Sequence, residues 1–410
     1  MAGLACARTL ARAKVRVLVL ESGDGVGGRV RSDREDGFVL DRGFQVFLSA
    51  YPEARRVLQL GALKLKAFEP GAKVFFKGRF HPVTDPFRRP MEALQTALGP
   101  VGTFRDKLTV LRLRSQARRG TLEELFLRPQ ETSLQRLKRL GFSDDMVSRF
   151  FRPFLGGIFL ESELVTSSRM LEFVFRMMAE GDVVLPVGGM GCLSDQLASQ
   201  LPTGSVRLQA QVCRVHPKSV ELVSGELLEA DAIVVATDGS QAAKLVPSLP
   251  EPRFCGTTTV YFAAAGSPHP GPYLLLNGEP EGRVNHVAVV SDVVSGYAPR
   301  GESLISVSLL GSRPPGVGLE DEVRAELQSW FGDSVFGWRH LRTYSLPHAL
   351  PLQSPGVFSP GATAARLPSG LFLCGDHREH GSIEGALVSG RRAGEAVLAQ
   401  LTGAGGVLRP

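Results

Sequence analysis

An acidic residue followed by two glycines and an arginine is the first segment of the sequence with evident chemistry. Glu21 ends an apolar run, Ser22 follows it, and Gly27, Gly28 and Arg29 come shortly afterwards. A carboxylate at the end of a strand accepts hydrogen bonds from ribose hydroxyls. Glycines let the backbone approach a diphosphate closely, and arginine supplies positive charge for it. The pattern predicts a dinucleotide site, and a solvated acid at a strand end is the alternative interpretation of Glu21.

The segment before this acid predicts a helix over residues 1–13 and a strand over residues 15–21. Gly3 stands in the third place of a GxGxxG turn, eighteen residues before Glu21. The strand that precedes such a turn, which is central in a sheet ordered 3-2-1-4-5, does not occur in these 410 residues. We therefore expect a reading frame that starts late and a chain that binds its dinucleotide poorly. We expect a version extended upstream by about 10–20 residues to bind it stoichiometrically.

A second motif near the end of the sequence supports the same kind of site. The apolar run 371–374 is followed by Gly375 and Asp376, and a turn then leads to a helix that starts near Ser382. The first turn of a helix offers N–H groups without intrahelical partners and a partial positive charge. Such a helix start suits a ligand group on which negative charge accumulates.

Both motifs resemble those of FAD-dependent oxidoreductases with the glutathione-reductase-type fold, in the superfamily of flavin amine oxidases, phytoene desaturases and protoporphyrinogen oxidases. The resemblance is carried by an ESxxxxGGR pattern that starts at Glu21 and a GD…GSIEGA pattern that starts at Gly375. It implies an α/β fold in which a Rossmann-like FAD-binding domain is interleaved with an α+β substrate domain of a mixed sheet and a helical subdomain. It also implies FAD as the cofactor and hydride transfer from the substrate to flavin N5.

The resemblance assigns further contacts to FAD. Asp376 would bond a ribityl hydroxyl or a phosphate-linked group, and the backbone amides of residues 382–384 would face the flavin C2 carbonyl. Gly43 would lie in a turn beside the flavin ring, and the backbone of Val212 would contact adenine. The expected FAD-binding residues are Gly3, Glu21, Ser22, Gly27, Gly28, Arg29, Gly43, Val212, Gly375, Asp376, Ser382, Ile383 and Glu384.

The hydrophobic pattern divides the chain into interleaved pieces of two domains. The FAD-binding domain is expected to comprise residues 1–70, 181–247 and 360–410, and the substrate domain residues 71–180 and 248–359. Residues 51–180, which are rich in Leu and Arg, predict a mainly helical region. Apolar runs between residues 250 and 360 predict a mixed sheet, with one amphipathic helix over residues 319–332.

Residues 149–168 indicate a large apolar substrate. They resemble the substrate-domain segment of phytoene desaturases, carotene isomerases and protoporphyrinogen oxidases, with Pro153, Gly157, Ile158 and Phe159 in the matching places. Either the phenylalanines of this segment line a substrate tunnel or they form the core of a helical subdomain. The four phenylalanines in question are Phe150, Phe151, Phe154 and Phe159.

Amine oxidation is disfavoured. Amine oxidases resemble one another in a lysine that bridges through water to flavin N5, and this chain has no lysine after Lys244. Ser382 stands where amine oxidases often carry tyrosine. The resemblance therefore implies phytoene desaturase-like dehydrogenation, or isomerisation, of a hydrophobic small molecule. A flavin amine oxidase or a protoporphyrinogen oxidase-like enzyme is the alternative, and a flavin-binding scaffold without turnover is the non-enzyme alternative.

The resemblance identifies no catalytic base. The segment over residues 338–351 is similar to the family's approach to the flavin, and Tyr344 and His348 are its candidates for facing the substrate. A structural role is the alternative for His348.

The charge and composition of the chain indicate which other partners and locations to expect. The net charge of +6 is spread thinly along the chain, so no nucleic-acid partner is expected. The densest charged patch is interpreted as a solvated helix face, with a peripheral membrane contact or a ligand contact as the alternative. It comprises Arg112, Arg114, Arg118 and Arg119. Five singly placed cysteines predict neither a disulfide framework nor a metal site. The cytosol is the expected location, with membrane association as the alternative, and the sequence indicates no oligomeric state.

Overall fold

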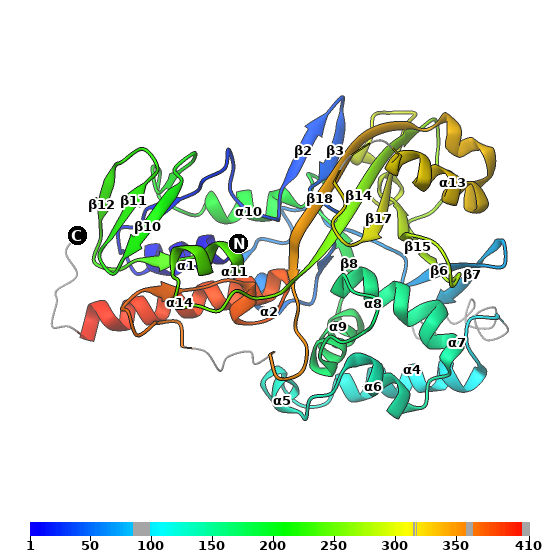
Figure 1. Cartoon of the computed structure of the whole chain (residues 1–410), viewed down its shortest axis with the longest axis horizontal. Coiled ribbons are helices and arrows are strands. Elements are labelled where there is room, and N and C mark those ends of the chain that lie inside the picture. The colour runs from blue at the N-terminus through cyan, green and yellow to red at the C-terminus, as the bar shows by residue number, and fades with distance from the viewer. Residues whose placement is uncertain (85–98, 315, 317, 358–363, 404–410) are drawn as a thin grey trace.

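The computed structural model describes residues 1–84, 99–314, 316, 318–357 and 364–403. The chain forms two parts, each built from separate pieces of sequence (Figure 1). One part contains α1 (Ala2–Arg12), α10 (Gly191–Ala198) and α14 (Ile383–Gly403), and the other contains a large sheet and a group of helices. This is a mixed α/β fold, as expected. The expected domain boundary at residue 360 lies outside the described residues.

A mixed seven-stranded sheet is the centre of the second part. Its order is β18-β14-β17-β16-β15-β6-β7, and its neighbours are antiparallel except for the parallel pair β15 and β6. The strands are β6 (Gly71–Phe76), β7 (Arg79–Thr84), β14 (Phe254–Ala264), β15 (Leu274–Asn277), β16 (Val284–Val289), β17 (Ser303–Leu310) and β18 (Arg339–Pro351). Helix α13 (Leu319–Phe331) packs on one face, where Leu327 and Trp330 share a core with Val287 and Val307.

Residues 66–84 form strands, so the expectation of a mainly helical region was wrong for this stretch. After the short β5 (Lys66–Ala67), strands β6 and β7 form a hairpin. Its turn residues Lys77 and Gly78 have φ angles of 52° and 73°. Positive φ at both central residues is the geometry that matches the twist of two antiparallel strands. A lysine and a glycine between two apolar runs are the sequence signal for this turn.

The helical group begins at residue 104 and lies below the sheet in Figure 1. It comprises α4 (Phe104–Ala117), α5 (Leu122–Leu127), α6 (Ser133–Leu140), α7 (Asp144–Met146), a π-helical turn (Val147–Phe151), α8 (Arg152–Phe159) and α9 (Ser168–Glu180). The first three helices are preceded by the N-cap residues Thr103, Thr121 and Thr132, each of which forms a capping box with the third helical residue. These caps satisfy backbone N–H groups that a helix start leaves free.

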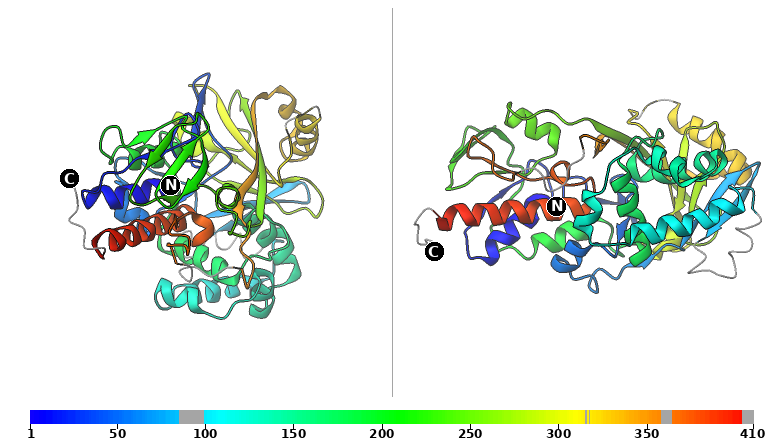
Figure 2. Two further views of the ribbon diagram at one scale, coloured as in Figure 1. Left: turned by 60° about the vertical axis from the view of Figure 1, so that its left-hand side comes forward. Right: turned by 90° about the horizontal axis from the view of Figure 1, so that it is seen from below.

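Helices α1 and α14 lie side by side in both views of Figure 2. Two glycines one turn apart on α14 permit this close approach. A Cβ atom on Gly390 would overlap the carbonyl oxygen of Ala2, and one on Gly394 would lie 2.8 Å from the Cβ of Thr9. The end of the sequence is thereby packed against its beginning.

Two short parallel strand pairs accompany these helices. Strand β1 (Val19–Leu20) pairs with β9 (Val206–Arg207), and β13 (Val234–Val235) pairs with β19 (Phe372–Leu373). Within the described part of the chain the two pairs are not joined into one sheet. Each of β1 and β13 therefore has a partner at one edge only, and β1 is two residues long where a strand over residues 15–21 was expected.

The other elements are short. They are β2 (Ser32–Glu35), β3 (Phe38–Asp41), β4 (Phe47–Leu48), α2 (Pro52–Val57), β8 (Val183–Leu185), β10 (Val212–His216), β11 (Ser219–Leu222), β12 (Leu227–Glu229), α11 (Gly239–Leu245), α12 (Val290–Val293) and 3-10 turns over Ser295–Tyr297, Gly332–Gly337 and Asp376–Arg378. Of the helices in the described ranges, none has both the length and the apolar character needed to cross a bilayer.

Candidate active site

A cavity of about 2600 Å³ is lined by residues of both parts of the molecule. One end lies among α1, the turn after β1 and the start of α14, and the other lies between the large sheet and helices α4, α8 and α9. The volume includes the space between β1 and β13, because residues 15–20 and 231–236 also line it. Pockets for drug-sized ligands measure roughly 300–1,000 Å³. The cavity therefore has room for a large cofactor and a substrate together.

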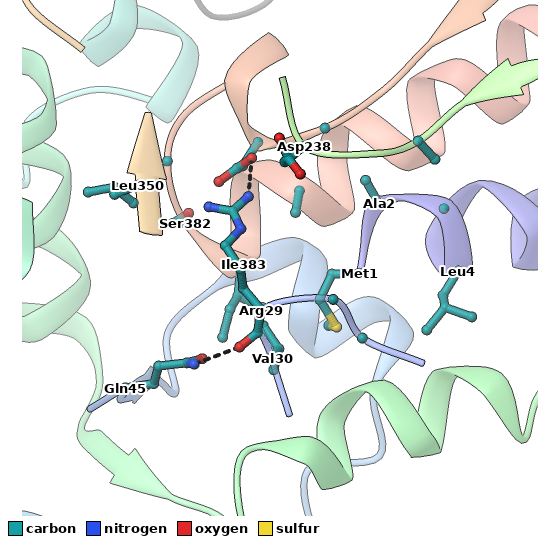
Figure 3. Close-up of a pocket in the computed structure, with 18 of the residues that line it drawn as sticks. Met1, Ala2, Leu4, Arg29, Val30, Gln45, Asp238, Leu350, Ser382 and Ile383 are labelled. Atoms are coloured by element: carbon teal, nitrogen blue, oxygen red, sulfur yellow. Dashed lines mark hydrogen bonds and ion pairs between the residues drawn. The ribbon is translucent and has the colours of Figure 1, made fainter. Parts of the chain in front are cut away.

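The glycine-rich turn and the carboxyl-terminal motif meet in this cavity. The Nη2 atom of Arg29 lies 2.7 Å from Oδ1 of Asp376, and Nη1 donates to the carbonyl oxygen of Ala349 at 2.6 Å. Burial opposes ionisation of Asp376, but the charge and hydrogen bond of Arg29 outweigh it and lower the pKa of Asp376. Figure 3 shows Arg29 close to Ser382 and Ile383. The two motifs thus form one charged, partly buried site.

Two further contacts fix the shape of this wall. Gln45 donates from Nε2 to the carbonyl oxygen of Arg29 at 2.7 Å (Figure 3). The same atom donates to the carbonyl oxygen of Arg42 at 3.0 Å. Gly43 has a φ of 85°, and a Cβ there would lie 2.9 Å from Cδ1 of Leu346. Glycine is therefore the residue that this turn accommodates. The sequence did not single out Gln45.

Helix α14 starts at the cavity. Ser382 caps it, because its Oγ accepts a hydrogen bond from the amide of Gly385 at 3.0 Å. Ser382 and Ile383 line the cavity, but Glu384 does not. The carboxylate of Glu384 instead accepts hydrogen bonds from the first amides of α2, at 2.7 Å from Glu53 N and 3.0 Å from Ala54 N. Burial raises the pKa of Glu384 to about 7.

All the expected FAD-binding residues except Glu384 line this one cavity. Glu21 keeps its carboxylate near its own turn, where Oε1 accepts a hydrogen bond from Gly23 N at 2.8 Å. The left-handed φ angles of Gly27 and Gly28 are 108° and 60°. A Cβ on Gly27 would collide with the carbonyl oxygen of Val30. The turn therefore presents backbone without side chains, as close approach to a diphosphate requires.

Aromatic residues line the other end of the cavity. Phe150, Phe154 and Phe159 lie in its wall, and the rings of Phe150 and Phe154 stack with centroids 5.1 Å apart. Phe151 is instead fully buried and packs on Phe142. For this segment both sequence interpretations apply, because one helical surface faces the cavity and the other faces the core. Lys107 and Arg114 of α4 add positive charge to this end.

The structure places neither catalytic candidate at the cavity. Tyr344 donates from its hydroxyl to Oδ2 of Asp33 at 2.7 Å, and His348 is exposed and packs on Phe254 with ring centroids 5.0 Å apart. Other residues of the same strand, Leu346 and Leu350, line the cavity instead. The register of β18 on β14 shifts near Cys255, and sequence alone does not show this irregularity.

Two further buried polar residues lie near the cavity. Asp41 accepts hydrogen bonds from Ser32 Oγ at 2.5 Å, Met190 N at 2.8 Å and Tyr297 OH at 3.2 Å. Burial raises the pKa of Asp41 to about 6. His286 lies on β16 and lines the cavity directly. A histidine within the apolar run VNHVAVV was the only sequence signal for it.

The sequence matches the family described as flavin containing amine oxidoreductase over residues 1–398. The chain belongs to this family. A curated relative, coproporphyrinogen III oxidase of Propionibacterium freudenreichii, is 27% identical over 405 residues, which cover 81% of this chain and 75% of the relative.

Several solved structures of oxidoreductases share the fold. An oxidoreductase from Methanosarcina mazei has a TM-score of 0.73 at 18% identity and covers 97% of both chains. A putative protoporphyrinogen oxidase from Exiguobacterium has a TM-score of 0.70 at 18% identity, again over 97% of both chains. Cyclohexylamine oxidase from Brevibacterium oxydans has a TM-score of 0.72 at 17% identity, over 98% of this chain and 97% of that one.

This family member is an FAD-dependent oxidoreductase, so the scaffold alternative is set aside. The residues present fit the cofactor: a turn without side chains at Gly27 and Gly28, the positive charge of Arg29 and the capped start of α14 all border one cavity. When bound, FAD supplies the acceptor for a hydride. We assign the diphosphate to the glycine-rich turn and the flavin to the end near Gly43 and Ser382 as a proposal.

Proposed function

We propose that this protein dehydrogenates a porphyrinogen, a large cyclic and mainly apolar molecule. The observation that carries the proposal is the size and character of the cavity beyond the FAD motifs. Its wall there is aromatic and aliphatic, with Phe150, Phe154 and Leu274 among its residues. A curated relative named for coproporphyrinogen oxidation supports the same substrate class.

The chain's own residues supply binding and orientation. Phe150 and Phe154 present stacked rings, which suit contact with the pyrrole rings of the macrocycle. Lys107 and Arg114 place positive charge in the same wall, and carboxylate substituents are the groups that such cations attract. The apolar side chains of this wall also keep water from the bound substrate.

A linear polyene is the second candidate, because the same aromatic wall suits a long conjugated chain. Its support is the segment over residues 149–168, which places Phe159 and Ile158 at the cavity. The two candidates differ in charge. A porphyrinogen with carboxylate side chains carries groups that the cations Lys107 and Arg114 in the cavity wall attract, whereas a polyene hydrocarbon carries no charge.

The test is anaerobic reduction of the FAD-loaded protein. Chemically prepared coproporphyrinogen is expected to bleach the flavin absorbance and to yield one fluorescent porphyrin for every three flavins bleached, because this oxidation removes six electrons and each FAD accepts two. Phytoene in detergent and a primary alkylamine serve as the comparison substrates. Bleaching by phytoene or by the amine, with none by the porphyrinogen, would refute the proposal.

A further inference from the structure

The α4 segment, which comprises helix α4 and its flanking residues (103–119), is strongly basic. It holds six arginines and lysines and a single acid, Asp106, an excess of five positive charges against +6 for the whole chain. Asp106 is buried, and its carboxylate accepts hydrogen bonds from the amides and hydroxyls of Thr103 and Ser143. The positive charge is therefore concentrated on the surface of one segment, and the expectation that it is spread thinly was wrong.

Most of these cations have no counter-charge within the protein. Four exposed arginines of the α4 segment form no ion pair within the described part of the chain, and they are Arg105, Arg112, Arg118 and Arg119. Elsewhere exposed arginines do pair, as Arg207 does with Glu226 at 2.6 Å. A guanidinium group without a partner is free to bind phosphate or carboxylate oxygens of another molecule.

Large apolar side chains lie on the outer side of the same helix, which runs along the lower side of the molecule in Figure 1. Phe104 is 65% exposed and Leu108 is 53% exposed. They are four residues apart and thus neighbours on one side of the helix, and Arg112 continues the row. Ser115, seven residues after Leu108, is exposed on this side without lining the cavity. This side of α4 therefore faces the solvent.

The exposed apolar residues also mark an opening of the cavity. Phe104 and Leu108 belong to its wall, together with Leu111 on the next turn. A side chain that lines a cavity and is more than half exposed lies where the cavity meets the surface. The apolar wall at the substrate end thus continues onto the outer side of α4, beside the unpaired arginines.

A bilayer that contains anionic phospholipid matches both features of this surface. Its phosphate groups supply the counter-charge, and lysines and arginines near such a surface are attracted to it. Its acyl region accepts the side chains of Phe104 and Leu108 just below the headgroups. An acidic polymer in solution satisfies the arginines alone and leaves the apolar side chains in water.

We propose that the α4 segment docks on the surface of an anionic phospholipid bilayer, with Phe104 and Leu108 in the acyl region and the four unpaired arginines on lipid phosphates. The cavity then opens toward the lipid, and an apolar substrate passes between bilayer and cavity without crossing water. The inference goes beyond the proposed function and does not depend on it, because a porphyrinogen and a polyene would use the same opening.

The first experiment is sedimentation of the FAD-loaded protein with vesicles of phosphatidylcholine, with and without added phosphatidylglycerol. The wild type is expected to sediment with the anionic vesicles, and less so as salt is added. The triple variant Arg112→Gln, Arg118→Gln and Arg119→Gln is expected to bind these vesicles roughly a hundredfold more weakly, about fivefold for each arginine.

A matched control removes the same charge elsewhere. Arg12→Gln, Arg300→Gln and Arg366→Gln change three exposed arginines outside the helical group, and this triple variant is expected to bind anionic vesicles like the wild type. Equal losses in the two triple variants would show that net charge, and not the α4 segment, attracts the protein, which overturns the inference.

A second experiment places the contact on the helix. Phe104→Trp is expected to show a blue shift of its emission on anionic vesicles and quenching by brominated lipid, because the ring enters the acyl region. Phe336→Trp, at a ring that is 58% exposed beside α13, is expected to show neither. Sedimentation of the protein without a response from Phe104→Trp contradicts the assigned surface.

The remaining outcomes separate this inference from the proposed function. A wild type that does not sediment with anionic vesicles overturns the inference and leaves the porphyrinogen chemistry, which flavin reduction tests, unaffected. Retention on immobilised polyglutamate without binding to vesicles overturns the bilayer as the partner and points to an acidic protein.

Discussion

The guanidinium group of Arg29 lies 2.7 Å from the carboxylate of Asp376, and this ion pair joins two motifs that are separated by most of the chain. Both partners line the cavity, and the Asp376 side chain is only 7% exposed. The pair therefore ties the integrity of the FAD site to the packing of the carboxyl-terminal helix.

Removal of Arg29 alone is expected to be costly. Arg29→Met leaves the Asp376 carboxylate buried without a counter-charge, which costs about 3–5 kcal/mol in the free energy of unfolding. The double variant Arg29→Met with Asp376→Asn removes both charges. Its free energy of unfolding is expected to fall by less than that of Arg29→Met alone. Urea unfolding of the two single variants and the double variant measures the coupling. Additive losses would show that the two groups do not stabilise each other.

The buried carboxyl of Asp41 predicts a pH dependence of stability. Its pKa is about 6 in the folded chain and about 3.8 in the unfolded chain, so the folded state holds the extra proton between these values. The contribution of Asp41 to the free energy of unfolding is therefore greatest below about pH 4, decreases as the pH rises to 6 and is constant above pH 6. The total decrease is up to about 3 kcal/mol. Asp41→Asn keeps the shape without the titration.

The measurement is the difference in unfolding free energy between the wild type and Asp41→Asn from pH 4 to pH 8. Taking the difference removes the contribution of the other titrating groups, which both proteins share. The stability of the variant relative to the wild type is expected to increase from pH 4 to about pH 6 and to stay constant above it. A difference that does not change with pH contradicts the assigned titration.

Contact between α1 and α14 depends on a residue without a side chain. Gly390→Ala places a methyl group against the carbonyl oxygen of Ala2 and is expected to destabilise the protein by about 1–3 kcal/mol. FAD retention is expected to fall as well, because both helices border the cavity. Gly403→Ala at the end of the same helix meets no atom within 4 Å and is the matched control. Thermal unfolding and the ratio of bound flavin to protein are the readouts, and equal behaviour of the two variants would contradict the packing argument.

The sequence-based catalytic candidates are expected to be inert. Tyr344→Phe removes a hydrogen bond to Asp33, and His348→Ala removes an exposed ring that packs on Phe254. Neither side chain lines the cavity, so kcat and KM for the porphyrinogen are expected to stay within about twofold of the wild type. Steady-state kinetics checks both values. A tenfold loss of kcat in either variant would indicate that the residue takes part in the reaction.

The sequence predicts those features of the structure that depend on residues close together in the chain. Glu21, Gly28 and Asp376 lie in short motifs whose spacing reflects one strand, turn or helix start, and the structure brings them to one cavity. His286 and Leu346 were not predicted because their orientation depends on which strand pairs with which and on shifts in register.

The role of Glu384 shows the same limit within a motif. Its position at the start of α14 was evident from the sequence, but the partner of its side chain, the first turn of α2, lies 330 residues away in the chain. Likewise, the parallel pairing of β6 with β15 joins two segments with the whole helical group between them. Contacts of this kind follow from tertiary packing, which overrides local propensity.

The two separate parallel strand pairs leave strand edges at which copies of the protein can associate. The free edges of β1 and β13 border the cavity, and backbone N–H and C=O groups at such edges are a template for pairing with another chain. We expect self-association that increases with protein concentration and begins at these two edges in the cofactor cavity. Excess FAD in the buffer is therefore expected to slow aggregation of the purified protein, which light scattering at two protein concentrations would record.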